Sequence, residues 1–274
     1  MAVELPDKLY HYTNVNALNG IIVNKKLWLG SLRHMNDTSE ELYFMDLLKK
    51  AVIVSKSDVT ATQRERIDSM FEKAKQELSE SPACVSCFSK RKDDAAQWER
   101  YADQGAGFCI EFDAQKLDKF IRGSLFLQPV YYSRDVLKHE HVELILEWLE
   151  NPKYTGGFNT FESWMGNIKS CACSFKHPSF EPEEEVRLVL LPELAEFAEG
   201  KWDYIISGGI IKKYFILDIE EIEKKKNLSF YDTINGIYIG PKSKQNPRIL
   251  YEYFRSKDID ISIEDIVVSE SPLQ

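Results

Sequence analysis

Residues Cys84–Ser89 read Cys-Val-Ser-Cys-Phe-Ser, a short run of small, β-branched and aromatic residues that is typical of a β-strand. The segment before it, Ala61–Glu80, carries apolar residues on one stripe and charged residues on the other, as an amphipathic helix does. The segment after it, Gly107–Asp113, alternates apolar with other residues, which is the period of a half-buried strand. This part of the chain therefore predicts a sheet that helices cover.

Further strands and helices are predicted on both sides of this region. The strand patterns are those of Leu9–Thr13, Lys26–Ser31, Leu125–Ser133, Val186–Leu191, Lys213–Ile219, Gly236–Gly240 and Ile261–Val268. One predicted helix has Leu18, Ile21 and Ile22 on one face, and a second begins at the Thr38-x-x-Glu41 capping box. A short helix is predicted around Trp98. Longer helices are predicted at His139–Glu150, Phe158–Ser170 and Pro247–Phe254. Because strands and helices are interspersed without regular β-α-β alternation, we predict an α+β fold with a mixed β-sheet core and surrounding helices.

The length and composition favour a single domain. The chain has 274 residues, of which 43% are hydrophobic, enough to bury a sizeable core without long disordered stretches. The sequence contains no repeat, low-complexity tract or Pro/Gly/Ser-rich linker. We therefore expect residues 1–274 to form one domain, in which 134–175 could be a helical insertion.

Charge and cysteine content restrict the setting and the partners. The formal net charge is −9, which argues against binding nucleic acid through overall positive charge but leaves room for a local basic groove. The N-terminus lacks the basic and apolar regions of a signal peptide, and no apolar stretch is long enough for a membrane span. The five cysteines are an odd number, which points to reduced thiols. We expect a cytoplasmic protein with no membrane partner.

The sequence does not favour a metal site or several common catalytic motifs. The pair Cys84-x-x-Cys87 lies in a predicted strand rather than a zinc knuckle, and the spacing Cys171-x-Cys173 is unusual for zinc. No G-x-S-x-G, G-x-G-x-x-G or Walker loop is present. We therefore expect no bound metal, no serine hydrolase and no Rossmann or P-loop nucleotide site.

The stretch Glu183-x-Glu185-x-Arg187 carries the most chemical information. The period of a strand would place the three charged side chains on one face, where they are costly unless solvated or paired. A carboxylate held there can stabilise positive charge that develops in a transition state. Arg187 could bind a phosphate or pair with a glutamate. The alternative is a solvated sheet edge with surface ion pairs.

His11 and the Cys84–Ser89 strand supply further candidates. An imidazole at a strand end can hydrogen-bond a ribose hydroxyl, and the alternative is a packed histidine satisfied by the backbone. Ser86 and Ser89 flank Phe88, but strand alternation leaves open which face meets a cleft. Phe88, Trp98 or Tyr101 could stack on a flat ligand ring. Trp98 and Tyr101 are also spaced to pack one helix on the sheet.

Several motifs together resemble a widespread bacterial family that is catalogued as a domain of unknown function. They are L-Y-H-Y-T at Leu9–Thr13, K-K-L-W-L-G-S at Lys25–Ser31, N-D-T-S-E at Asn36–Glu40, S-C-F-S at Ser86–Ser89, W-E-R-Y-A-D at Trp98–Asp103, G-F-C-I-E-F at Gly107–Phe112, K-H-P-S-F-E-P-E-E-E-V-R at Lys176–Arg187 and I-Y-I-G-P-K at Ile237–Lys242. The resemblance extends over nearly the whole chain, and it implies a family rather than a chemistry.

Three of these motifs are also similar, more distantly, to those of the ADP-ribosyltransferase superfamily. That superfamily has a His or Arg on an early strand, an aromatic or Ser-x-Ser-like pattern on a middle strand and a catalytic Glu at the start of a late strand. The resemblance implies a split-sandwich sheet, NAD as substrate, Glu185 as the catalytic carboxylate and Glu183 as the residue that helps activate the acceptor. It further implies NAD contacts from His11, Tyr12, Thr13, Ser86, Phe88, Ser89, Tyr101 and Arg187.

The activity implied by this resemblance is transfer of ADP-ribose to a nucleic acid or protein, or hydrolysis of NAD, in a toxin or anti-phage defence setting. A second interpretation is a non-catalytic binding or interaction module of the same fold. A third is a nuclease or another nucleic-acid enzyme, for which the sequence offers no metal-binding carboxylates beyond Glu183 and Glu185.

Overall fold

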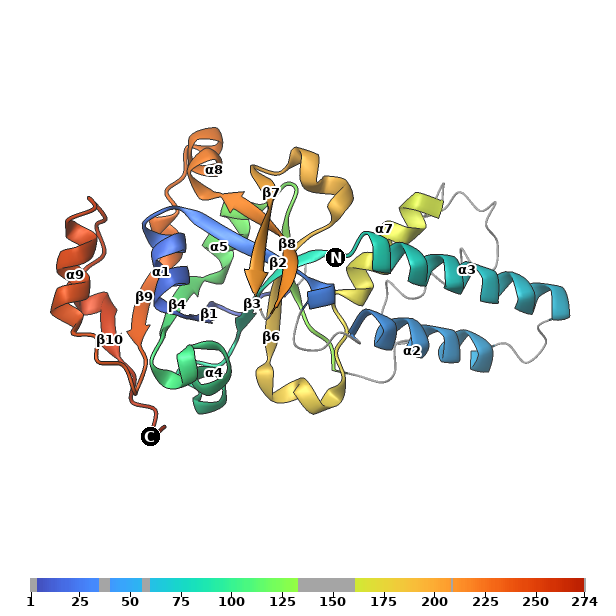
Figure 1. Ribbon diagram of the computed structural model, residues 1–274, viewed down its shortest axis with the longest axis horizontal. Coiled ribbons are helices and arrows are strands. Elements are labelled where there is room, and N and C mark those ends of the chain that lie inside the picture. The colour runs from blue at the N-terminus through green and yellow to red at the C-terminus, as the bar shows by residue number, and fades with distance from the viewer. Residues whose placement is uncertain (1–3, 35–39, 56–59, 133–160, 208, 274) are drawn as a thin grey trace.

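The computed structural model describes residues 4–34, 40–55, 60–132, 161–207 and 209–273. Within these ranges the chain is an α+β protein with a mixed sheet and helices around it, as the sequence predicted (Figure 1). The strands are β1 (Lys8–Thr13), β2 (Lys26–Ser31), β3 (Cys84–Ser89), β4 (Phe108–Asp113), β5 (Phe126–Pro129), β6 (Glu185–Leu190), β7 (Gly200–Ser207), β8 (Ile210–Asp218), β9 (Ile234–Ile239) and β10 (Ile266–Val268).

The helices come from segments distributed along the chain. They are α1 (Val15–Ile22), α2 (Glu40–Ser55), α3 (Ala61–Glu80), α4 (Ala95–Tyr101), α5 (Ala114–Ile121), α7 (Phe161–Ala172), α8 (Ile219–Lys226) and α9 (Pro247–Arg255). Short 3₁₀ segments lie between them, of which η4 (Pro178–Glu183) matters most for the site. None of the helices in the described ranges is both long and apolar enough to cross a membrane.

Strand β3 holds two halves of the sheet together. Along one edge it pairs with β6 over its whole length, from Cys84 opposite Leu190 to Ser89 opposite Glu185. On its other edge, β2 pairs with β3 at Cys84 and Val85, whereas β1 pairs with it only at Ser89. Because a strand has only two edges, β1 and β2 share this one and part between their pairing positions.

The two halves extend in opposite directions from this parting. On one side the order continues from β1 through β4 and β9 to β10, and on the other side it continues from β2 through β8 to β7. Strand β5 adds to the free edge of β6. The pair of β9 and β10 is parallel and the other pairs are antiparallel, so the sheet is mixed.

Side-chain caps fix where several helices begin. Asn14, Asp94 and Asn246 each accept a hydrogen bond from a backbone N–H in the first turn of α1, α4 and α9. Asp113 and Asp218 cap α5 and α8 in the same way, directly at the ends of β4 and β8. Neither α5 nor α8 was predicted from the sequence, because each follows its strand without a turn, although the capping aspartates were a signal for both helices.

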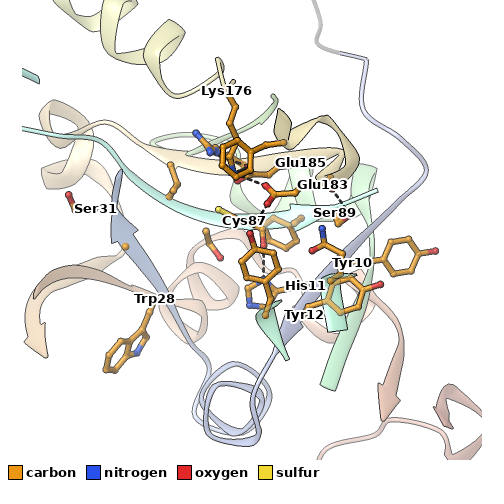
Figure 2. A pocket seen from close by; sticks show the side chains of 18 of the residues that line it. Tyr10, His11, Tyr12, Trp28, Ser31, Cys87, Ser89, Lys176, Glu183 and Glu185 are labelled. Atoms are coloured by element: carbon orange, nitrogen blue, oxygen red, sulfur yellow. Dashed lines mark hydrogen bonds and ion pairs between the residues drawn. The ribbon is translucent and has the colours of Figure 1, made fainter. Parts of the chain in front are cut away.

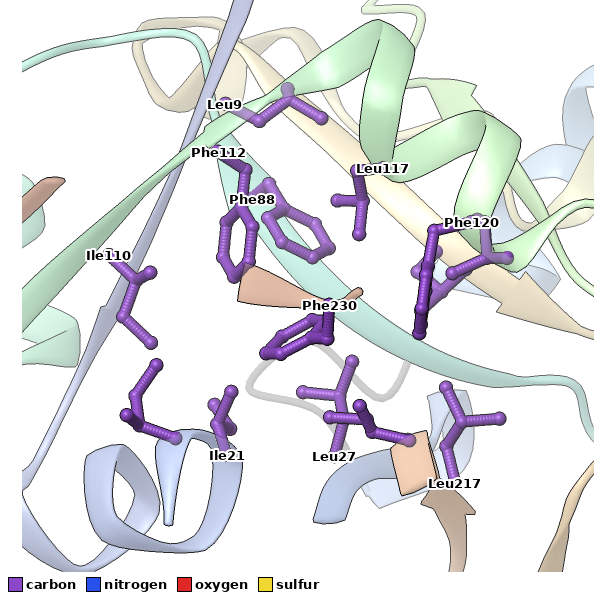
Figure 3. Packing of buried hydrophobic residues seen from close by; sticks show 14 of the residues in the cluster. Leu9, Ile21, Leu27, Phe88, Ile110, Phe112, Leu117, Phe120, Leu217 and Phe230 are labelled. Carbon is purple, nitrogen blue, oxygen red and sulfur yellow. The ribbon is translucent and has the colours of Figure 1, made fainter. Parts of the chain in front are cut away.

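The main hydrophobic core lies under one face of the sheet. Phe88, Phe112 and Phe230 meet at its centre, with ring centroids 5.7 Å and 6.0 Å apart for the successive pairs (Figure 3). The apolar faces of α1, α5, α8 and α9 pack against the same cluster. On the opposite face, Trp98 of α4 packs against Tyr10 and Tyr12, so the expected packing of Trp98 on the sheet is confirmed.

A helical lobe of α2, α3 and α7 has its own apolar cluster, which includes Phe44, Phe71 and Phe175 (Figure 1). The sequence left room for a helical insertion at 134–175, and α7 falls inside that range. The predicted His139–Glu150 helix lies outside the described residues, as does Thr38 of the predicted capping box. The lobe draws mainly on α2 and α3, whose apolar stripes meet each other and α7 rather than the sheet.

Strands β5, β7 and β10 differ most from the expectation. The run Leu125–Ser133 forms β5 only as far as Pro129, after which Tyr131 pairs with Phe175 instead of continuing along β6. Strand β7 was not predicted, although the charged and aromatic residues of Lys201–Tyr204 alternate in its sequence, Gly-Lys-Trp-Asp-Tyr-Ile-Ile-Ser. The predicted Ile261–Val268 strand shrinks to β10.

The β3–β6 pair should dominate the stability of the sheet. Leu188 is 0% exposed in the main core, so Leu188→Ala should lower the free energy of unfolding by about 2–5 kcal/mol. Ile206, near the end of β7, is 78% exposed, and Ile206→Ala should change the free energy of unfolding by no more than about 0.5 kcal/mol. Urea denaturation of both variants tests this, and equal losses would contradict the central place given to β6.

Candidate functional site

A cavity of about 280 Å³ lies where β1 and β2 part along β3 (Figure 2). Its walls come from β1, β2, β3, β6 and β8, together with α4 and η4. It is lined by Tyr10, His11, Tyr12, Trp28, Gly30, Ser31, Val85, Ser86, Cys87, Phe88, Ser89, Gln97, Tyr101, Lys176, Phe180, Glu183, Glu185, Arg187 and Tyr214.

The structure brings most of the predicted site residues to this cavity. Those that line it are His11, Tyr12, Ser86, Phe88, Ser89, Tyr101, Glu183, Glu185 and Arg187. Thr13 does not line it and is buried in β1 instead. The aromatic residues Trp28 and Tyr214 were not among the predicted site residues, and Lys176 was noted only as part of a family motif.

The cavity receives side chains from both faces of the sheet. Cys87 and Ser89 lie opposite Arg187 and Glu185, so these four side chains share one face. Phe88 belongs to the main core on the other face, and the His11 ring lies 5.3 Å from the Phe88 ring between centroids. His11 and Glu185 can both reach the cavity because the parted edge of β3 opens the sheet between them.

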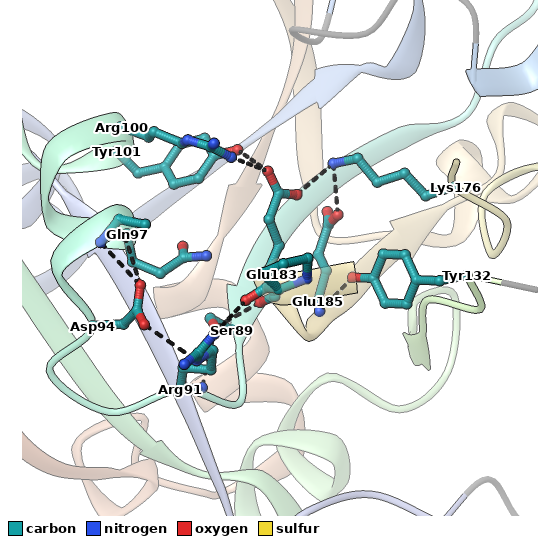
Figure 4. Close-up of polar contacts among 12 residues, drawn as sticks. Ser89, Arg91, Asp94, Gln97, Arg100, Tyr101, Tyr132, Lys176, Glu183 and Glu185 are labelled. Carbon is teal, nitrogen blue, oxygen red and sulfur yellow. Dashed lines mark hydrogen bonds and ion pairs between the residues drawn. The ribbon is translucent and has the colours of Figure 1, made fainter. Parts of the chain in front are cut away.

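A buried network of charges forms one wall of the cavity (Figure 4). Lys176 Nζ lies 2.6 Å from Glu183 Oε2 and 3.1 Å from Glu185 Oε2. Arg187 donates from Nε and Nη2 to the two oxygens of Glu185, at 2.7 Å and 3.1 Å, and from Nη1 to the Cys173 carbonyl at 2.9 Å. All four charged side chains are buried, with Glu185 at 4% and Arg187 at 1% exposure.

The two cations hold Glu185 in its ionised form. Burial on its own raises the pKa of this carboxyl, but the charges of Arg187 and Lys176 outweigh it and lower the pKa to about 2. Burial and the neighbouring Glu185 carboxylate have the opposite effect on the Cys87 thiol, whose pKa they raise. At neutral pH the cavity therefore contains a carboxylate at Glu185 beside a protonated thiol.

Glu183 reaches the network from a different local structure than predicted. It ends η4, and Glu184 then adopts a left-handed conformation with φ of 43°, so β6 begins only at Glu185. The left-handed turn at Glu184 therefore separates the Glu183 side chain from the strand that carries Glu185 and Arg187. The expectation of three charged residues on one strand face was therefore wrong for Glu183.

The alternative of a solvated charged edge is also wrong. Glu183 is buried, and its Oε1 accepts hydrogen bonds from Tyr101 Oη at 2.9 Å and Arg100 Nη1 at 3.2 Å (Figure 4). Ser89 Oγ donates to the Glu183 carbonyl at 2.8 Å, which ties η4 to the end of β3. Burial with several partners for each carboxylate is the arrangement of a preorganised polar site.

Lys176 is placed by contacts that the sequence does not reveal. Its backbone N–H donates to the Tyr131 carbonyl, next to the bridge between Tyr131 and Phe175. Its ammonium group lies 4.7 Å from the centre of the Phe180 ring. The Tyr132 hydroxyl accepts a hydrogen bond from the Glu185 backbone N–H at 2.8 Å, so the same short segment positions both Lys176 and Glu185.

The partner of His11 fixes which ring nitrogen carries the proton. His11 Nδ1 lies 2.9 Å from the Cys87 carbonyl oxygen, which can only accept, so Nδ1 is the donor. Burial lowers the pKa of His11 by more than this hydrogen bond raises it. The imidazole is therefore neutral at pH 7, and Nε2 is a hydrogen-bond acceptor.

Tyr12 has a positioning role in addition to lining the cavity. Its hydroxyl donates to the Arg91 carbonyl at 2.8 Å and accepts from the Asp94 N–H at 3.0 Å. Its ring meets Trp98 edge-on at 5.0 Å between centroids. The hydroxyl of Tyr12, a residue that the resemblance implied as an NAD contact, thus holds the loop that leads into α4.

Residues 97–188 match a family. The matching family model is described as "Protein of unknown function (DUF2971)". The predicted resemblance to a domain of unknown function is therefore confirmed for this segment, which holds Tyr101, Lys176 and the two glutamates but not His11 or β3. No curated protein matches the chain. No solved structure matches it either.

The cysteines do not form a metal site in the described part of the chain. The five thiols are free of disulfides there, and no group of three or more His, Cys, Asp or Glu residues is placed to hold a metal ion. Cys84 faces the main core, whereas Cys87 faces the buried charges, so the two cannot bind one ion together.

We expect purified protein to contain no stoichiometric zinc, because no zinc-like set of ligands converges in the described ranges. Elemental analysis should find far less than one zinc per chain, and a chelator should leave the melting temperature unchanged. One tightly bound zinc per chain, with a melting temperature that falls on chelation, would overturn this expectation.

The Glu185 ion pairs should make stability depend on acidity. The folded-state pKa, about 2, lies below the ordinary value of 4.5, so the contribution is complete above pH 4.5 and is lost as pH falls towards 2. The loss from this group should reach about 3 kcal/mol across that range.

Arg187→Gln removes the main cause of the lowered Glu185 pKa, so the acid-dependent loss should be smaller in this variant than in the parent. The variant should also be less stable at neutral pH, by about 3–5 kcal/mol, because a buried carboxylate loses one of its partners. Urea midpoints from about pH 6 to about pH 3 measure both effects. Parallel curves for parent and variant would argue against the Glu185–Arg187 pair as the cause.

Proposed function

We propose that this chain is an NAD-dependent ADP-ribosyltransferase-like enzyme, which transfers ADP-ribose to a nucleic acid or protein or hydrolyses NAD. One observation carries the proposal: the three sequence-distant motifs, at His11, β3 and Glu185, line a single cavity where the sheet parts. The toxin or defence setting implied by the motif resemblance belongs to the same proposal.

Glu185 supplies the charge that the reaction requires. When the bond between the ribose anomeric carbon and nicotinamide breaks, nicotinamide leaves with the electron pair and positive charge develops on the sugar. A carboxylate fixed beside that carbon stabilises the charge without reorganising during the reaction. The pKa of about 2 keeps Glu185 ionised at neutral pH, and its pairs with Arg187 and Lys176 fix its orientation.

His11 suits the role of orienting the sugar. Its Nδ1 is held by the Cys87 carbonyl, which leaves Nε2 as an acceptor for a ribose hydroxyl. Because the imidazole is neutral, it adds no positive charge near the carbon where positive charge develops. This contact exists before the reaction begins, so it contributes to binding of NAD as well as to its turnover.

The size of the cavity suits one end of the dinucleotide. A volume of about 280 Å³ lies just below the roughly 300–1,000 Å³ of typical ligand pockets, so the nicotinamide ribose would fill it. The remainder of the molecule would then extend over the rim. In this proposal Glu183 accepts a proton from an acceptor hydroxyl or a water, and its position beside Glu185 across the shared Lys176 supports that role.

A specific observation favours the second interpretation, a binding module without turnover. Both carboxylate oxygens of Glu185 already accept from Arg187, and one also contacts Lys176. A carboxylate that is compensated in this way stabilises a developing cation less than an unpaired one would. The two interpretations share the cavity and its ligand and differ only in whether nicotinamide is released.

The decisive variants are Glu185→Gln and Arg187→Gln. Each breaks the same buried pair, so both should lose stability to a similar degree, but only Glu185→Gln removes the carboxylate. Nicotinamide release from NAD should fall about 100- to 1000-fold in Glu185→Gln. Arg187→Gln, assayed well below its melting temperature, should retain much more activity.

Equal activity in Glu185→Gln and the parent would exclude the transferase mechanism, and absence of nicotinamide release by the parent would favour the binding module.

Glu183→Gln should impair transfer to an acceptor more than hydrolysis of NAD. His11→Ala should raise KM as well as lower kcat, because its contact forms in the ground state. Melting curves for every variant separate these effects from misfolding.

A further inference from the structure

The wall of the cavity opposite the charge network is aromatic. Strands β2 and β8 pair with Trp28 opposite Ile216 and Gly30 opposite Tyr214, so Trp28 and Tyr214 are diagonal neighbours on one face. The other face of this pair carries Leu29 and other core residues. Trp28, Gly30 and Tyr214 therefore point away from the main core and towards the cavity that all three line.

Trp28 is unusually exposed for a tryptophan in the interior of a strand. Its exposed fraction is 45%, although indole rings usually account for much of the buried area of a fold. Its ring lies 5.6 Å from the Tyr214 ring between centroids, at an interplanar angle of 55°. Figure 2 shows Trp28 on the far side of the cavity from Lys176. The two rings thus form a partly open aromatic rim.

We propose that Trp28 and Tyr214 form a stacking subsite for a nucleobase at the rim of the cavity. This inference rests on the proposed function and specifies where the part of the substrate outside the cavity is held. Flat heteroaromatic rings stack on aromatic side chains whatever the base, because every base has a π-face. Gly30, which lies opposite Tyr214, has no side chain to cover the approach from the cavity.

The polarity of the two walls supports a nucleotide over a purely apolar ligand. One wall holds Lys176, Glu183 and Glu185, whose charged groups can hydrogen-bond the hydroxyl groups of a sugar. The other wall holds the two rings, which suit a base. A molecule with a polar sugar and a flat ring matches both walls, whereas an aliphatic chain could not hydrogen-bond the buried charged groups.

The nucleobase has two sources within the proposed reaction. It is either the adenine of the dinucleotide, extending from the nicotinamide ribose, or a base of a nucleic-acid acceptor that approaches the same carbon. The chemistry of stacking is shared, and the two sources are separated by the probe. ADP-ribose carries adenine without nicotinamide, and a short single-stranded DNA oligonucleotide carries acceptor bases alone.

The experiment is calorimetric titration of the parent, Trp28→Leu and Trp28→Phe with each probe. Tyr204→Leu is the matched control, because Tyr204 is an exposed aromatic residue on neighbouring β7 that does not line the cavity. Trp28→Leu should weaken binding of one probe by about 5- to 150-fold. Trp28→Phe should restore part of it, and Tyr204→Leu should bind as the parent does.

A loss confined to ADP-ribose identifies the adenine of the dinucleotide, and a loss confined to the oligonucleotide identifies an acceptor base. Unchanged binding of both probes by Trp28→Leu overturns the inference, as does a parent that binds neither probe. The stacking subsite can exist even if the proposed enzymatic function is wrong. In that case Trp28→Leu would weaken ADP-ribose binding although the parent releases no nicotinamide. The reverse result, normal turnover with no effect of Trp28→Leu, would reject the rim alone.

Discussion

A β-strand can pair along only two edges, and this constraint on β3 shapes the whole molecule. One edge is used completely by β6, so β1 and β2 must share the other. They pair at opposite ends of β3 and part between, which opens the sheet without leaving its halves unconnected. The cavity lies where β1 and β2 separate. The Cys87 carbonyl accepts a hydrogen bond from the His11 ring there instead of from a neighbouring strand. Fold and site are consequences of the same pairing.

The buried charges turn this opening into a chemical environment. Removing Glu183, Glu185, Lys176 and Arg187 from water is costly, and the cost is offset only because each charge has close partners of opposite sign. The network joins three segments: the stretch after α7, the end of η4 and the start of β6. Such an arrangement adds less to stability than well-packed apolar residues would, which is why a functional role is the more economical reason for it.

The cavity combines three different surfaces. Carboxylates and cations occupy one wall, a neutral imidazole with a defined tautomer occupies the middle, and an aromatic pair occupies the rim. The helical lobe of α2, α3 and α7 contributes indirectly, since α7 leads into the segment that positions Lys176. The DUF2971 match begins in α4 and ends in β6, so it covers the charged wall and not the histidine or the rim.

The sequence alone determined the local elements, because periodicity and caps act within a few residues. It predicted β3, α3 and β4, and it singled out His11 and Glu185. It missed Lys176 as a partner of both glutamates and Trp28 with Tyr214 as a rim, because these depend on which strands pair and in which register. It also placed Glu183 on a strand, whereas the left-handed backbone of Glu184 separates Glu183 from β6. A period of two shows which side chains of a strand share a face, but not which residues of other strands that face contacts. Only the pairing of distant strands around β3 decides those contacts.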